Sequence, residues 1–165
     1  MMVSIVPVTE ADLPEIHSIY NHFVLTSTAT FDLTERPFEE RVSWFRSLPA
    51  GCVAAVMRYG IEVAGYGAVS PWGGKEGYAG CGEVSLYLIP KFQGKGFGKQ
   101  LLKSLMEGAR AGGLHTLIAR ITTENPISLH LHLKAGFKEV GTLKEAGDKF
   151  GRKLDVTFLQ AMLRE

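Results

Sequence analysis

The 165-residue sequence has few cysteines, little net charge and no long apolar run. Its two cysteines, Cys52 and Cys81, fit no zinc-ligand spacing and are expected to be free thiols in a reducing compartment. The 18 basic and 17 acidic residues give a formal net charge of +1, so no strong field would attract nucleic acid or an anionic membrane. Apolar runs are far shorter than the roughly 20 residues of a membrane-spanning helix, and the N-terminus lacks the layout of a secretory signal. We therefore expect a cytoplasmic protein that binds neither nucleic acid nor membranes.

The composition is that of an ordinary folded protein, with 45% hydrophobic and 21% charged residues. A chain of this length buries one substantial core, and no repeat or linker divides it, so residues 1–165 are predicted to form a single domain. Strand and helix patterns are mixed along the chain, which favours an α/β unit.

Local patterns place most of the expected elements. Apolar residues at helical spacing predict helices after Thr9, at Pro37 and after the glycines at 94–98. Strands are predicted over residues 5–8, 53–57, 61–69, 84–89, 116–122 and 154–159, and the second and third form a hairpin. Segment 125–137 alternates like a strand, but Asn125, Pro126 and Gly136 are helix-boundary signals, so we predict a helix there.

A glycine-rich segment, Gln93-Gly94-Lys95-Gly96-Phe97-Gly98-Lys99, lies between a predicted strand and a predicted helix. Its glycines let backbone N–H groups converge on an anion at the helix N-terminus, so we expect a phosphorylated ligand. A triphosphate P-loop would need glycine at 93 and serine or threonine at 100, and both are glutamine; a dinucleotide fingerprint would need glycine at 99, which is lysine. The alternative is a tight turn that only connects strand and helix.

Two segments resemble motifs of the GNAT acetyltransferases. Gln93-x-x-Gly96-x-Gly98 after a strand resembles the family's Q/R-x-x-G-x-G/A pattern, and residues 124–137 resemble its N-x-x-S-x-x-L-H-x-x-x-G-F segment. Tyr20-Asn21, Glu83 before the Val-Ser-Leu-Tyr-Leu strand, and residues 149–155 are similar to the phosphinothricin and methionine sulfoximine acetyltransferase branch. The resemblance implies a GNAT fold, a mostly antiparallel twisted sheet flanked by helices and splayed near Leu88.

The same resemblance implies acetyl-CoA as the cofactor. The loop amides would hold its pyrophosphate, with Lys95 and Lys99 adding positive charge, and the strand backbone would pair with its pantetheine arm. The implied cofactor-binding residues are Leu86, Tyr87, Leu88, Gln93, Gly94, Lys95, Gly96, Phe97, Gly98, Lys99, Asn125 and Ser128. Asn125 could also act only as a helix cap.

Three groups carry the expected chemistry. A protonated amine must lose a proton before it attacks a thioester, and by resemblance Glu83 is the base, directly or through water, although a glutamate at a strand end is often simply solvated. His132 occupies the position from which relatives protonate the departing thiolate, although it could equally be a packed histidine. The Leu88 backbone N–H is the expected donor to the tetrahedral intermediate. No metal is expected, because His130 and His132 are two residues apart on a predicted helix and face different sides.

The acceptor pocket is expected, by resemblance, to include Phe31, Trp72, Tyr78, Lys149 and Arg152. Arginines that the branch often carries after the tryptophan and before the catalytic strand are Gly73 and Ala79 here, which weakens the expectation of a carboxylate-bearing acceptor.

The resulting hypothesis is direct transfer of the acetyl group of acetyl-CoA to the amino group of a small amino-acid-like molecule of the phosphinothricin or methionine sulfoximine/sulfone type. The alternatives are acetylation of another amine, such as a polyamine or a protein N-terminus, and a coenzyme A-binding module without catalysis. Relatives usually form homodimers, so a homodimer is expected.

Overall fold

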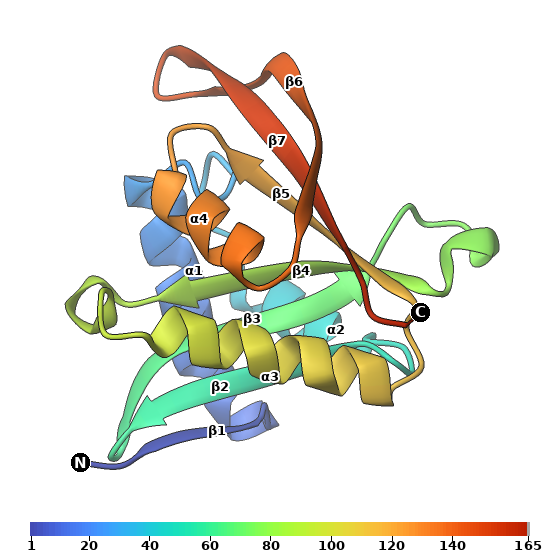
Figure 1. Ribbon diagram of the computed structural model, residues 1–165. Coiled ribbons are helices and arrows are strands. Elements are labelled where there is room, and N and C mark those ends of the chain that lie inside the picture. Colours follow the sequence, from blue (N-terminus) through green and yellow to red (C-terminus); the bar gives the residue numbers. More distant parts are fainter. Residues whose placement is uncertain (165) are drawn as a thin grey trace.

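The computed structural model describes residues 1–164, and a seven-stranded sheet forms its centre (Figure 1). The strands pair in the order β1-β2-β3-β4-β5-β7-β6, and each neighbouring pair is antiparallel except β4 with β5. The strands are β1 (Val3–Pro7), β2 (Val53–Tyr59), β3 (Glu62–Pro71), β4 (Cys81–Leu88), β5 (Thr116–Thr122), β6 (Lys138–Lys149) and β7 (Arg152–Met162). This mixed α/β, mostly antiparallel arrangement confirms the predicted fold class.

Helices cover both faces of the sheet (Figure 1). The four α-helices are α1 (Leu13–Thr26), α2 (Phe38–Arg46), α3 (Phe97–Ala111) and α4 (Pro126–Lys134), and short 3-10 turns span Glu10–Asp12, Glu76–Tyr78 and Pro90–Phe92. Residues of α1 and α2 pack with Val56, Val63 and Tyr66 in one hydrophobic cluster, whereas residues of α3 and α4 pack in the larger cluster on the other face. Among residues 1–164 no helix is long and apolar enough to cross a membrane.

Local signals explain where the helices begin. The carboxylate of Asp12 accepts hydrogen bonds from the backbone N–H and hydroxyl of Thr9, at 2.8 and 2.9 Å, as part of a capping box. At α4 the Asn125 side chain accepts from the Ser128 N–H at 3.1 Å, and Pro126 occupies the first turn. The helix predicted over the alternating segment 125–137 is therefore confirmed.

The sheet opens between β4 and β5. Their parallel pairing joins Cys81–Glu83 to Thr116–Ile118, and from Val84 onward β4 pairs with β3 alone in the described chain. Because parallel strands held by three residue pairs are free to diverge, a cleft forms along the second half of β4. The divergence begins earlier on β4 than the expected point near Leu88.

No sequence pattern predicts β6, and this is the main omission from the expected elements. β6 is an edge strand whose residues are mostly exposed, so it shows no alternation of apolar and polar residues. Its pairing with β7 shifts register twice, and Glu145 within it has a positive φ of 52°. A charged, bulged edge strand lacks the signal on which strand prediction depends.

Candidate active site

A cavity of about 710 Å³ lies between the α1–α2 loop and the sheet face formed by β3, β4 and β5. Alternate residues of β4, namely Glu83, Ser85 and Tyr87, line its floor, because successive side chains of a strand point to opposite faces. Most of its remaining polar lining comes from α1, α2, the loop that joins them, and β5; these residues include His17, Tyr20, Thr30, Asp32, Arg36, Glu40, Arg41, Arg120 and Thr122. The cavity thus combines carboxylate and guanidinium groups.

Glu83 is held by Arg120, which sequence reasoning missed. Arg120 Nε lies 2.7 Å from Glu83 Oε2 and its Nη2 donates to Oε1 at 2.8 Å, a two-point contact between neighbouring strands. The Arg120 guanidinium also lies 5.6 Å above the centre of the Trp72 ring. Thirty-seven positions separate Glu83 from Arg120, and the parallel pairing of β4 with β5 brings them together.

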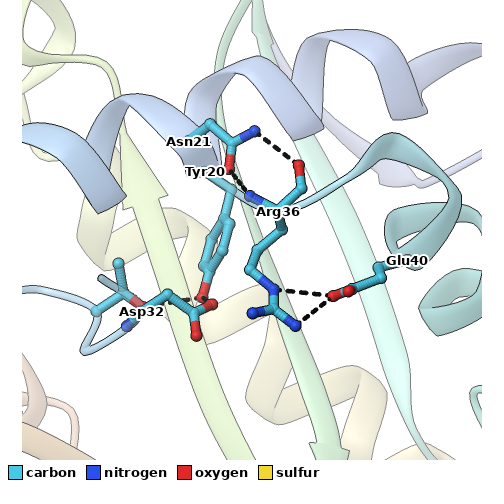
Figure 2. A network of polar contacts seen from close by, with 6 residues as sticks. Tyr20, Asn21, Asp32, Arg36 and Glu40 are labelled. Atoms are coloured by element: carbon cyan, nitrogen blue, oxygen red, sulfur yellow. Dashed lines mark hydrogen bonds and ion pairs between the residues drawn. The ribbon is translucent and has the colours of Figure 1, made fainter. Parts of the chain in front are cut away.

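A hydrogen-bonded network braces the loop that roofs the cavity (Figure 2). The Tyr20 hydroxyl donates to Asp32 and lies 2.8 Å from the Thr30 hydroxyl, and burial together with Asp32 raises the pKa of Tyr20 to about 12. The Asn21 side chain exchanges hydrogen bonds with the backbone of Arg36, at 3.0 and 3.1 Å. Tyr20 therefore stays protonated at neutral pH and, with Asn21, fixes the loop to α1.

A second, narrower cavity of about 60 Å³ continues into the opening between β4 and β5. Its lining includes the predicted cofactor-binding residues Leu86, Tyr87, Asn125 and Ser128, and also His132. The two cavities share Ala29, Val84, Ser85, Tyr87, Arg120 and Thr122. A molecule in the β4–β5 opening would therefore reach the larger cavity.

Backbone alternation directs two N–H groups of β4 into this opening. The Ile89 N–H donates to Ala64 at 2.9 Å, so odd-numbered residues of β4 turn their backbone groups toward β3. Leu86 and Leu88 then turn theirs toward the side from which β5 has diverged. In agreement, the Leu88 carbonyl accepts from the Gln93 side chain at 3.0 Å instead of from β3. Gln93 thus ties the strand end to the glycine loop.

The glycine loop has the shape of an anion cradle. Gly94 and Gly96 have φ values of 73° and 79°, and a Cβ added at either would meet nothing within 4 Å. Gly96 caps α3, so the N–H groups of the first helical turn face the open space, and the exposed Lys95 and Lys99 flank it. The donor set of N–H groups and lysines fits a pyrophosphate, and buried Phe97 anchors the helix start.

His132 is buried, and its surroundings favour the neutral imidazole. Its Nδ1 lies 2.8 Å from the Ser128 carbonyl oxygen, which can only accept, so Nδ1 carries the hydrogen and Nε2 keeps a lone pair. Burial lowers the pKa of His132, with the Ser128 contact opposing it. Protonation of a leaving thiolate by Nε2 would require the imidazolium form, which this environment disfavours. His130 on the same helix is exposed, and among residues 1–164 no group of three His, Cys, Asp or Glu residues could hold a metal ion.

The structure separates the five predicted acceptor-site residues. Phe31 lines the larger cavity. Trp72 lies beneath Arg120 and packs on Phe158, which does line the cavity. Tyr78 is half exposed outside the cavity, where its ring lies over Gly73.

The two predicted cations of the acceptor site brace its loop and are absent from the cavity lining. The buried Lys149 ammonium donates to the Thr30 carbonyl at 2.7 Å, and burial lowers the pKa of Lys149. Arg152 pairs with Glu124, which also accepts from the Thr28 hydroxyl at 3.3 Å. Both contacts attach the roof of the cavity to the β6–β7 hairpin, so Lys149 and Arg152 act on the site through the loop.

Similarity to proteins of known function agrees with this geometry. Residues 15–137 match the acetyltransferase (GNAT) family. An L-methionine sulfoximine/L-methionine sulfone acetyltransferase from Pseudomonas paraeruginosa is 39% identical over 99% of this chain and 96% of its own length. A phosphinothricin N-acetyltransferase from Streptomyces coelicolor is 36% identical over 98% of this chain and 96% of its own.

Solved structures point to the same fold. A GNAT superfamily phosphinothricin acetyltransferase from Sinorhizobium meliloti, in complex with acetyl-CoA, superimposes with a TM-score of 0.93 at 34% identity and covers 98% of this chain and 89% of that one. The family match spans most of the sequence, and the relatives align over nearly all of it. The chain belongs to the GNAT acetyltransferase family and is an acetyl-CoA-dependent N-acetyltransferase.

Proposed function

We propose that this enzyme acetylates the α-amino group of a free amino-acid-like molecule, of the methionine sulfoximine, methionine sulfone or phosphinothricin type. The observation that carries the proposal is the Glu83–Arg120 pair in the wall of a cavity that joins the β4–β5 opening. An α-amino acid carries an ammonium and a carboxylate on the same carbon atom, and the Glu83–Arg120 pair offers the complementary charges side by side. The named substrates of the relatives belong to this chemical class.

The cofactor would be held at two places. Backbone N–H groups of Gly94–Lys99 and the two loop lysines would bind its pyrophosphate, while Leu86, Leu88, Asn125 and Ser128 would border its pantetheine arm. When bound, acetyl-CoA supplies an acetyl thioester that an amine can attack. The remaining steps depend on side chains and backbone groups of this chain.

Glu83 would accept the proton that the acceptor ammonium must lose. Its carboxylate lines the cavity and is 24% exposed, and the cavity has room for water beside an acceptor. The two-point contact with Arg120 fixes the orientation of this carboxylate. On an extended strand Leu88 lies about 16 Å from Glu83, whereas Leu86 lies about 10 Å away, at roughly 3.3 Å per residue. The Leu86 N–H is thus a second candidate, beside Leu88, for the donor to the tetrahedral oxygen.

Arg120 would also bind the acceptor carboxylate and so take over the task of the arginines absent at positions 73 and 79. It reaches the same region, because its guanidinium lies over Trp72, next to Gly73. Its contacts with Glu83 use Nε and Nη2, which leaves the Nη1 hydrogens for a ligand. Arg120→Gln should raise the acceptor KM about 10-fold or more and leave the acetyl-CoA Kd unchanged. An unchanged acceptor KM in steady-state assays would refute this role.

We further propose a homodimer that acts in the cytoplasm. Leu143 on β6 lines the cavity and is half exposed, and Val140 and Phe150 on the same hairpin are also exposed, so a second subunit covering this hairpin would close one side of the cavity. The two thiols, Cys52 and Cys81, are unpaired, which suits a reducing compartment.

Thiol release from acetyl-CoA tests the proposed function. Purified protein would be assayed with methionine sulfoximine, methionine sulfone, phosphinothricin, the common amino acids, polyamines and N-terminal peptides, with hydrolysis subtracted. Release with the sulfur or phosphinate amino acids is expected. Polyamines should be poor acceptors, because they carry no carboxylate for Arg120 to bind. Release with polyamines or peptides alone would overturn the proposed acceptor class.

A further inference from the structure

Arg41 on α2 differs from the other arginines of the larger cavity. Arg36 pairs with Glu40 at 2.7 Å and Arg120 pairs with Glu83 at 2.7 Å. Among residues 1–164 no carboxylate lies within ion-pair distance of Arg41, although its guanidinium lines the same cavity. One cation of the site therefore lacks a negative partner.

The surroundings of Arg41 make the lack of a carboxylate partner energetically unfavourable. Its Nε is buried and has no hydrogen-bond partner in the described chain, and its guanidinium lies 4.8, 4.7 and 5.5 Å from the ring centres of Tyr20, Trp44 and Tyr66. Contacts with aromatic faces compensate only part of the lost hydration of a cation. They also hold the planar fork in place, so that it is ready to bind an oxygen-bearing group.

Arg41 lies at a distance from the Glu83–Arg120 pair, where the reaction is proposed to take place. Its contact with Tyr66 places it over β3, whereas Arg120 belongs to β5. These strands are separated by β4, and two strand spacings are about 10 Å. Glu83, Arg120 and Arg41 line the same cavity, so an amino acid with its amine beside Glu83 and its carboxylate at Arg120 has room to extend its side chain across β4 toward Arg41.

We propose that Arg41 determines acceptor specificity by binding the oxygen atoms of a sulfonyl, sulfoximine or phosphinate group at the far end of the acceptor side chain. The assignment rests on the proposed function. Such oxygens are strong acceptors, and a guanidinium donates to two of them at once. An acceptor without them would leave the cation unpaired and should be used poorly.

Methionine sulfone and methionine test the assignment, because they differ only in the two sulfonyl oxygens. The kcat/KM for each would be measured with the unaltered enzyme, with Arg41→Gln and Arg41→Lys, and with Arg46→Gln as a control. Arg46 is on the same helix, is exposed and pairs with Glu10 outside the cavity. The unaltered enzyme should prefer the sulfone, and Arg41→Gln should lower kcat/KM for the sulfone by roughly 10- to 100-fold while changing that for methionine less than about 3-fold.

Arg41→Lys keeps the charge without the planar fork and should lose part of the preference, and Arg46→Gln should lose none of it. The acetyl-CoA Kd of each variant shows whether the protein is folded, and the lysine variant decides the matter if the glutamine variant does not fold. Equal losses for both acceptors would place Arg41 at the shared carboxylate and overturn the assignment, as would an unchanged preference. If the unaltered enzyme acetylates neither amino acid nor any other of the panel, the proposed function itself is wrong and the assignment falls with it.

Discussion

At the scale of single residues, the chemistry depends on Glu83 and on what surrounds it. Replacing the carboxylate by an amide in Glu83→Gln keeps the size and an oxygen that Arg120 can contact, but it removes the base. General-base catalysis contributes about 10²- to 10⁴-fold, so kcat should fall by about 100-fold or more, while the acetyl-CoA Kd measured by calorimetry stays within about 2-fold. Glu76→Gln, in an exposed turn outside the cavity, is the matched control. A kcat close to that of the unaltered enzyme would remove Glu83 from the mechanism.

His132 gives a prediction about pH. Burial lowers its pKa in the folded protein, so the unfolded chain takes up the proton first as pH falls, and the free energy of unfolding should decrease below the ordinary histidine pKa of about 6.5. Urea unfolding between pH 7.5 and 5 should show this decrease, and His132→Gln should show a smaller one. Some decrease should remain, because burial and Arg41 also lower the pKa of His17. Parallel curves for the two proteins would contradict the account.

Sequence patterns draw attention to Glu83, His132 and the glycine loop because each belongs to a local motif, and their roles stay predictions. The patterns do not draw attention to Arg120 or Arg41. Arg120 meets Glu83 through strand pairing across 37 positions, and Arg41 meets Tyr66 through packing of α2 on the sheet. No periodicity or spacing in the sequence predicts these two contacts between distant residues.

At the scale of elements, the connection from β4 to α3 combines a strand with free N–H groups and a loop of left-handed glycines. Gly96→Ala would place a Cβ at φ 79°, which costs about 1–2 kcal/mol, and would fill the space expected to hold phosphate. The acetyl-CoA Kd should rise about 10-fold. Gly113→Ala, at φ 97° beyond the other end of α3, introduces similar strain. The acetyl-CoA Kd of this variant should not change. A similar rise in Kd for both variants would mean that strain alone, and not the cradle, affects binding.

Some helices and strands could be predicted from the sequence, and others could not. Strong caps or apolar periods identify α1, α2, α3, α4 and most strands. The edge strand β6 lacks both, because it is charged, exposed and bulged. Lys149 and Arg152, which flank the turn of its hairpin, consequently contact the cavity loop and its neighbour Glu124 in a way that local patterns do not foresee.

At the scale of the whole molecule, the sheet consists of β1–β4 and β5–β7–β6, joined by one short parallel pairing, and both cavities lie at this junction. The predicted homodimer should appear as twice the monomer mass in light scattering at micromolar protein. Leu143→Lys on β6 should shift the mass toward the monomer, whereas Ile61→Lys in the β2–β3 turn, which is fully solvated, should not. A monomeric mass for the unaltered protein would refute the dimer.

The most direct measurement is the identity and stoichiometry of the products formed from acetyl-CoA and methionine sulfone. The account predicts one N-acetylated amino acid, identified by mass spectrometry, for each coenzyme A thiol released. Thiol release without an acetylated amino acid across the sulfone, sulfoximine and phosphinothricin would contradict it, because the cavity would then not be an amino-acid acceptor site.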